Sequence, residues 1–165
     1  MYFQKFPDIL YTFDIGNTTV LKPVTDITQN VRLRKKILEN VLLYDEYDIK
    51  EGETPEIIAA KYYGSSGYHW IVMLCNQMYD WRSDWPMPYH TLEQYILDKY
   101  QSVENANATH HYIDSSGYTV NSDSPGATPV SNYQYEQDIN ESKRRIKLIN
   151  AQLLNAIVNE FTALV

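Results

Sequence analysis

The chain has 165 residues, 44% of them hydrophobic and 21% charged, which excludes a globally disordered protein. Its formal net charge of -7 argues against nucleic acid or an anionic membrane as the main partner, because phosphate groups are bound by basic surfaces. The single cysteine, Cys75, excludes an internal disulfide, and no apolar run approaches the length of a membrane span.

Residues 1–13 form an apolar, aromatic arm in which we expect a strand. Ile9, Tyr11 and Phe13 would lie on one side of it, and the Asp, Gly and Asn residues within 14–17 predict the turn that ends it. We expect this arm to dock on the compact part of the chain or on another subunit. Its start lacks the basic residues and long apolar core of a signal peptide.

A helix capped by Asp26 is predicted over residues 24–41. Four basic residues between positions 32 and 36 indicate a solvated helix face, or alternatively a docking site for an acidic partner surface.

The stretch 44–80 carries the densest local signals. Tyr44, Tyr47 and Ile49 alternate with acidic residues, which predicts a short, half-buried strand ending at Gly52. A helix of about two turns should follow, with Thr54 as N-cap, Pro55 at the first position, an apolar face starting at Ile57 and its end at Gly64. A second helix, capped by Ser65 or Ser66, should be buried on most sides and should hide Cys75.

This order of a strand, the string EGETPEIIA and a second short helix resembles the LysM module, usually a glycan-binding domain of βααβ form. The longer string KYYGSSGYHWIVMLCNQMYDW is similar to the baseplate wedge protein 53 family of contractile-tailed bacteriophages. The resemblance implies that a LysM-like module is embedded in a longer structural subunit. Its groove would lie near Gly52, Glu53, Thr54 and Pro55 and would serve as a protein-contact block or, alternatively, bind a glycan.

Beyond the central stretch we expect a stiff, proline-bearing loop over 81–88, whose two tryptophans need burial in the module or in a partner. An amphipathic helix capped by Thr91 should run to Tyr100, followed by a polar loop over 101–109.

Residues 111–120 predict a β-hairpin with Gly117 in the left-handed region. An isolated hairpin is marginal in water, so we expect it to add to another strand or to a neighbouring subunit. Residues 121–132 are expected to form a linker, after which Ser131 and Gln134 suggest a capping box.

Residues 132–165 carry an apolar stripe from Ile139 to Leu164 at intervals of seven, three and four, which predicts one long helix or two shorter ones. An element of about thirty residues would be about 45 Å long, so part of the stripe should contact another chain or fold back.

Fifteen tyrosines stand beside four phenylalanines and three tryptophans, a skew that is typical of protein interfaces, although many of these rings could simply edge the core. The predicted interface residues are Tyr62, Tyr63, Tyr68, Trp70, Trp81, Trp85, Arg144, Arg145, Leu153, Ile157 and Phe161.

No catalytic, metal or cofactor site is predicted. The four histidines have no metal-binding spacing, and the adjacent His110 and His111 should point to opposite sides of a strand. Glu51, Glu53 and Glu56 precede or begin a helix, where the helix dipole favours the ionised carboxylate over the proton donor of a cell-wall hydrolase.

We therefore expect an α+β fold with an N-terminal arm and helix (1–43), a LysM-like βααβ core with a following helix (44–100), a loop, hairpin and linker (101–131) and a long C-terminal helical segment (132–165). The resemblance implies a non-enzymatic baseplate wedge subunit in the virion, assembled in the host cytoplasm, that joins wedge components and adjacent wedges around the hub. Its partners would be other wedge subunits, with no nucleic acid, membrane, small-molecule substrate or cofactor. The alternative is a LysM-type protein that binds peptidoglycan or chitin.

Overall fold

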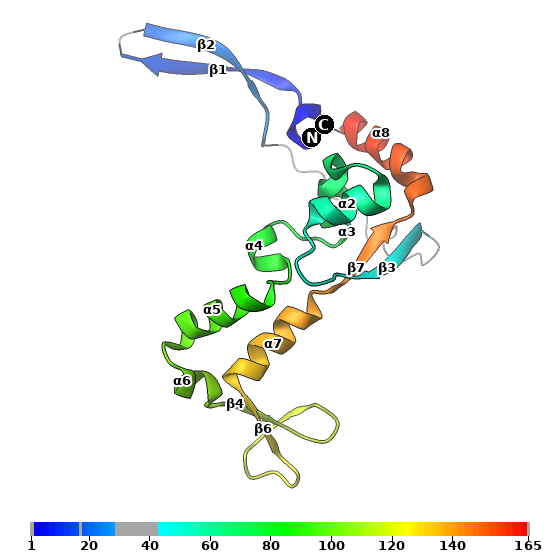
Figure 1. The fold of residues 1–165 in the computed structure, drawn as a ribbon. Coiled ribbons are helices and arrows are strands. Elements are labelled where there is room, and N and C mark those ends of the chain that lie inside the picture. Colours follow the sequence, from blue (N-terminus) through cyan, green and yellow to red (C-terminus); the bar gives the residue numbers. More distant parts are fainter. Residues whose placement is uncertain (1, 17, 29–42, 165) are drawn as a thin grey trace. The chain divides into compact units, whose positions relative to one another are not determined.

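The computed structural model describes residues 2–16, 18–28 and 43–164 (Figure 1). Helices and small sheets are mixed along the chain, so the predicted α+β class is confirmed. The chain divides into two compact units, each discontinuous in sequence: unit 1 comprises 1–47, 53–79 and 147–165, and unit 2 comprises 48–52 and 80–146. Most of the helix predicted over 24–41, including its basic residues, lies outside the described residues.

Unit 1 begins with a short 3-10 helix, η1 (Tyr2–Lys5), and a hairpin of two eight-residue strands, β1 (Asp8–Ile15) and β2 (Thr18–Thr25). The predicted first strand and turn are confirmed, and Gly16 has a φ of 64°. The second strand was not predicted, and it includes the positions at which a helix was expected to begin. Its β-branched residues, in two groups at 18–20 and 24–25, favour an extended backbone.

Strand β3 (Tyr44–Asp48) and helix α2 (Pro55–Tyr63) confirm the predicted strand and first helix of the central stretch. The Thr54 side chain accepts a hydrogen bond from the Ile57 backbone N–H, and Gly64 ends the helix with a φ of 78°. The predicted apolar face is wrong by one position, because Ile58 is buried whereas Ile57 is 41% exposed.

The second predicted helix is present as α3 (His69–Cys75), after a 3-10 turn, η3 (Ser66–Tyr68), that Ser65 caps. Its side chains form the centre of the core of unit 1, together with Phe6, Ile149 and Phe161. Phe161 lies 4.6 Å from Trp70 and 5.9 Å from Phe6 between ring centroids, which ties the start and end of the chain to the central helix.

The C-terminal stripe does not belong to a continuous helix. It is divided among α7 (Asn132–Ser142), strand β7 (Arg145–Ile149), a 3-10 turn, η4 (Ala151–Leu153), and α8 (Leu154–Leu164). β7 pairs with β3, and the flanking hydrogen bonds, from Ile49 N–H to the Arg144 carbonyl and from Asn150 N–H to the Leu43 carbonyl, run in antiparallel order. One long helix of about 45 Å is therefore excluded, and the structure agrees with the alternative of two shorter helices, although the strand β7 between them was not predicted.

Residues 81–107 of unit 2 form three helices where one was expected: α4 (Trp81–Asp84), α5 (Tyr89–Tyr100) and α6 (Val103–Asn107). The predicted loop at 81–88 includes the short helix α4, and the predicted loop at 101–109 includes α6, which Ser102 caps. α5 begins two residues before the expected cap at Thr91, after Pro88. Leu92, Ile96 and Ala106 form the small core between these helices.

A three-stranded antiparallel sheet in unit 2 contains β4 (Thr109–Ile113) in the centre, flanked by β5 (Thr119–Val120) and β6 (Thr128–Ser131). The predicted hairpin and the φ of 83° at Gly117 are confirmed, and the hairpin does add to a further strand. That strand is β6, so the end of the predicted linker is not irregular. Ser131 caps α7 as expected.

Buried polar contacts join α5 to α7. Glu136 is 5% exposed and accepts hydrogen bonds from Lys99 at 2.6 Å and Tyr100 at 2.9 Å. Asn140, also buried, exchanges two hydrogen bonds with the backbone of Met87. Both buried side chains are thus paired, as stability requires of polar groups removed from water.

Candidate protein interface

Of the four residues predicted to line a groove, Gly52 belongs to unit 2, whereas Glu53, Thr54 and Pro55 are held by contacts within unit 1. The Glu53 carboxylate is 7% exposed; it accepts hydrogen bonds from Tyr47 Oη at 2.8 and 3.0 Å and from Lys61 Nζ at 2.5 Å. Burial, together with the neighbouring Glu53 carboxylate, raises the pKa of Tyr47. Thr54 is used as a helix cap and Pro55 is buried. These polar groups stabilise the turn itself.

The tyrosines predicted to meet other subunits are half-buried in unit 1. The Tyr63 hydroxyl donates to the Ile149 carbonyl at 3.0 Å, and burial raises its pKa. Tyr62 bonds to the Asp45 carboxylate, and burial followed by that bond raises its pKa to about 12. Tyr63 also packs edge-on against Tyr62 and Tyr68. Tyr63 and Tyr68 pack against the core of unit 1, and contact of the three rings with another subunit stays a prediction.

The large apolar side chains among the predicted interface residues lie at different depths. Trp70 and Phe161 belong to the core of unit 1, and Leu153 and Ile157 pack against it. Of the two tryptophans expected to need burial, Trp85 is 4% exposed and Trp81 is 57% exposed. Trp85 is therefore buried within this chain, whereas burial of Trp81 in a partner stays a prediction.

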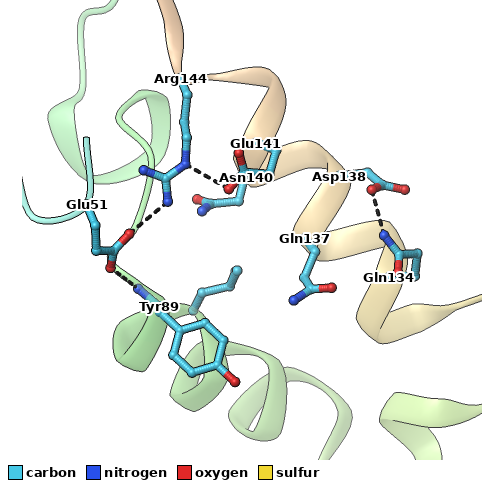
Figure 2. Close-up of a pocket in the computed structure, with 9 residues that line it drawn as sticks. Glu51, Tyr89, Gln134, Gln137, Asp138, Asn140, Glu141 and Arg144 are labelled. Atoms are coloured by element: carbon cyan, nitrogen blue, oxygen red, sulfur yellow. Dashed lines mark hydrogen bonds and ion pairs between the residues drawn. The ribbon is translucent and has the colours of Figure 1, made fainter. Parts of the chain in front are cut away.

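Arg144 forms the best-defined charged contact of unit 2, shown in Figure 2. Its guanidinium donates to Glu51 at 2.9 Å, to Glu141 at 2.7 Å and to the Ile49 carbonyl at 3.2 Å. Glu51 in turn accepts from the Tyr89 backbone N–H at 2.6 Å at the start of α5. That hydrogen bond and the Arg144 guanidinium lower the pKa of Glu51.

Beside this ion pair lies a pocket of about 240 Å³. One face of α7 contributes most of its polar lining, namely Gln134, Gln137, Asp138, Asn140 and Glu141. A catalytic acid requires a carboxyl with a raised pKa, whereas Glu51 at this pocket has a lowered one. The arrangement is suited to linking the start of α5 to the end of α7.

The histidine pair differs from the prediction. His110 Nδ1 lies 2.9 Å from His111 Nδ1, and the His110 ring stacks on Tyr135 with centroids 3.9 Å apart. An irregularity in the β4–β6 pairing between Thr109 and His111 removes the simple alternation of side chains that the prediction assumed. Among the described residues, no three His, Cys, Asp or Glu side chains are grouped so that they could hold a metal ion.

The hairpin β1–β2 of unit 1 exposes apolar side chains, and only its first strand was predicted. All eight residues of β1 are exposed, and β2 is exposed or half-exposed throughout. The sequence signal that could have revealed β2 is Gly16-Asn17 between two runs of strand-forming residues, a two-residue turn of the hairpin type. No helix in the part of the chain that the structure describes is long and apolar enough to cross a membrane.

Comparison with known proteins gives two matches. The sequence model of the family "Base plate wedge protein 53" matches residues 1–125, which include the hairpin, the central helices and part of unit 2. The baseplate wedge protein gp53 of Enterobacteria phage T4 is 26% identical over 184 aligned positions that cover 97% of this chain and 93% of the relative. Because the family model covers well over half of the sequence, the chain belongs to the base plate wedge protein 53 family.

Proposed function

We propose that this chain is a structural subunit of a contractile phage-tail baseplate wedge, which joins wedge components and adjacent wedges around the central hub during tail assembly. Membership of the family and the match along nearly the whole T4 protein support a structural role in the baseplate of a virion and contacts with other baseplate proteins. The joining of adjacent wedges, the hub and assembly in the host cytoplasm are parts of the proposal.

The observation that carries the proposal is the family match combined with exposed apolar surface. Ile9, Tyr11, Phe13 and Ile15 are between 37% and 60% exposed in β1, and Trp81 is 57% exposed in unit 2. Exposed apolar residues gathered on one element mark contact surfaces. The predicted groove at Gly52–Pro55 would act as a protein-contact block rather than as a glycan site, since Glu53 and Thr54 are already hydrogen-bonded within unit 1.

We also propose that the chain is not an enzyme. At the pocket lined by Glu51 and Arg144, the pKa of Glu51 is lowered, and Arg144 is bound by two carboxylates. This arrangement lacks the poised acid or base that hydrolysis of a cell-wall polymer would require.

The test is sedimentation velocity of the purified chain, alone and mixed with wedge subunits of the same phage. A defined larger complex is expected, and an oligomer of N-acetylglucosamine in a parallel cell should neither bind nor compete. Absence of any complex, together with saturable binding of the sugar, would overturn the proposal in favour of a LysM-type glycan-binding protein.

Among the predicted interface residues, Trp81 is the exposed aromatic ring, so Trp81→Ala is the matching variant. It should weaken the complex by about tenfold or more, as truncation of an aromatic interface anchor does. Tyr118→Ala removes a ring that is 73% exposed, is not among the interface residues named above and follows a hairpin strand that pairs with β6 within the chain, so it should leave the complex unchanged. Equal effects of the two substitutions would remove Trp81 from the proposed interface.

A further inference from the structure

The hairpin β1–β2 has one strongly apolar face. Its cross-strand register pairs Ile9 with Val24, Phe13 with Val20 and Tyr11 with Lys22, so these side chains lie on the same face. A two-stranded hairpin is marginally stable in water by itself, and this one pairs with no third strand among the described residues. A further strand from a neighbouring chain would therefore stabilise it.

The two edges of the hairpin differ because of Pro23. Proline has no N–H, so the rung that joins Leu10 to Pro23 cannot be a hydrogen-bonded pair. Hydrogen-bonded and non-hydrogen-bonded pairs alternate along an antiparallel ladder. Thr12–Leu21 lies two pairs from Leu10–Pro23, so it is also a non-hydrogen-bonded pair whose backbone N–H and C=O groups point outward. Ile15–Thr18, three pairs beyond Thr12–Leu21, is then a hydrogen-bonded pair, as expected next to a tight hairpin turn.

The outer edge of β1 can therefore accept a further strand with a full set of hydrogen bonds, whereas the outer edge of β2 cannot. The outer edge of β1 presents the N–H and C=O groups of Leu10, Thr12 and Asp14, a regular series of donors and acceptors. The outer edge of β2 lacks the donor at Pro23, the device by which proteins protect a sheet edge. The free ladder of β1 is thus the one open to β-augmentation.

Charge indicates what kind of strand fits. Asp8 and Asp14 lie on the second face of β1, six positions apart, and each accepts a hydrogen bond from a threonine of β2, at 3.3 and 3.0 Å. Neither has a basic partner among the ion pairs of the described residues. A second copy of β1 would bring further carboxylates to that face. A strand with a basic residue at each end would neutralise both aspartates.

We propose that β1 receives a strand from a neighbouring wedge subunit, an extended segment with alternating apolar residues and a basic residue near each end. Its backbone would bond to Leu10, Thr12 and Asp14, and its apolar side chains would extend the face of Ile9, Tyr11 and Phe13. The origin of the strand in a wedge subunit rests on the proposed function, whereas the open edge of β1 is a property of this chain.

The test uses proline at the two positions of a single rung. Thr12→Pro removes an outward N–H from β1, and Leu21→Pro removes its counterpart from β2, so both leave the hydrogen bonds within the hairpin intact. In wedges assembled from purified subunits, Thr12→Pro should weaken binding by about tenfold or more, because at least one of the added hydrogen bonds is lost. Leu21→Pro should stay within about twofold of the unsubstituted chain.

A peptide probe makes the test independent of the wedge. A labelled peptide with capped ends, Lys-Val-Thr-Val-Thr-Val-Lys, places its lysines opposite Asp8 and Asp14, and a control peptide carries glutamates in their place. The lysine peptide should bind the full chain more tightly than the control, and Thr12→Pro should abolish the difference. Hydrogen exchange should then slow at the amides of Leu10 and Asp14.

The outcomes of these experiments distinguish strand addition to β1 from the proposed function. If the chain joins the wedge but the two proline variants behave alike, strand addition to β1 is overturned and the proposed function stands. If the chain joins no wedge, the proposed function fails, and the lysine peptide decides alone whether β1 accepts a strand. If the chain forms a dimer that Thr12→Pro dissociates, the strand added to β1 comes from a second copy of the chain. The proposal of a basic partner strand is then overturned.

Discussion

At the scale of single residues, Glu53 is a buried charged side chain whose contacts should contribute to the stability of unit 1. It is buried, and Tyr47 and Lys61 bond to the same carboxylate. Only the carboxylate is buried, since the Lys61 side chain is 59% exposed, so removing a partner would leave that buried charge without compensation. This contact therefore fixes the turn between β3 and α2 more firmly than its position on a loop would imply.

We predict that Glu53→Gln lowers the free energy of unfolding by about 1–3 kcal/mol, the usual cost of weakening a buried, charge-assisted hydrogen bond. Urea unfolding monitored by tryptophan fluorescence measures it. Glu56→Gln, at an exposed position in α2, should change stability by less than about 0.5 kcal/mol. A loss no larger than that of Glu56→Gln would show that the Glu53 contacts are not stabilising.

Glu51 predicts a dependence of stability on pH. The Tyr89 N–H and Arg144 lower the pKa of Glu51 in the folded chain, so its contribution is present above the unfolded pKa, which is 4.5 for an ordinary glutamate. That contribution is lost as the pH falls through the folded pKa. The stability difference between the unsubstituted chain and Glu51→Gln should therefore shrink as the pH falls below about 4.5. Unfolding curves measured between pH 7 and pH 3 test this, and a constant difference would contradict it.

At the scale of elements, helix α7 depends on its cap. The Ser131 hydroxyl accepts from the Gln134 backbone N–H at 3.1 Å. Ser131→Ala should lower the free energy of unfolding by about 1 kcal/mol, because that N–H loses its partner. Ser115→Ala, in the turn before Gly117, is the matched control and should be nearly neutral. Chemical denaturation with circular dichroism measures both, and equal losses would mean that the cap contributes nothing.

The elements also show which parts of the fold a sequence can predict. α2 was predicted with both ends, because Thr54, Pro55 and Gly64 act through bonds within a few residues. β7 was not, because Ile146, Leu148 and Ile149 also fit a helical stripe. They form a strand because β3, about a hundred residues earlier, offers a ladder. Local periodicity carries no information about such a distant partner.

The candidate interface was predicted to a similar extent. Tyr62, Trp70 and Phe161 were selected for their aromatic character, which does not distinguish a ring that edges the core from one that meets another subunit. The exposed hairpin was foreseen as a single strand, because the helix expected from residue 24 obscured β2. Contacts with other chains leave their trace in exposure, and exposure follows only once the tertiary packing is known.

At the scale of the whole molecule, the two units have separate cores, one around Trp70 and Phe161 and the other around Leu92 and Ile96. We predict that they unfold in two thermal transitions. Thr54→Ala should lower the transition of unit 1, and Ser131→Ala that of unit 2, each by several degrees. Scanning calorimetry resolves the transitions; one shared transition, shifted equally by both variants, would contradict independent units.

The pairing of β3 with β7 has a consequence during synthesis of the chain. β3 emerges from the ribosome early, but its partner follows only after residues 80–146 have been made. Closing so long a loop of unstructured chain is entropically costly, and a waiting strand edge is prone to wrong pairing. If unit 2 folds first, it holds residues 48 and 146 within one compact body and so shortens the effective loop. In that case, folding of unit 2 would bring β3 and β7 together before unit 1 is complete.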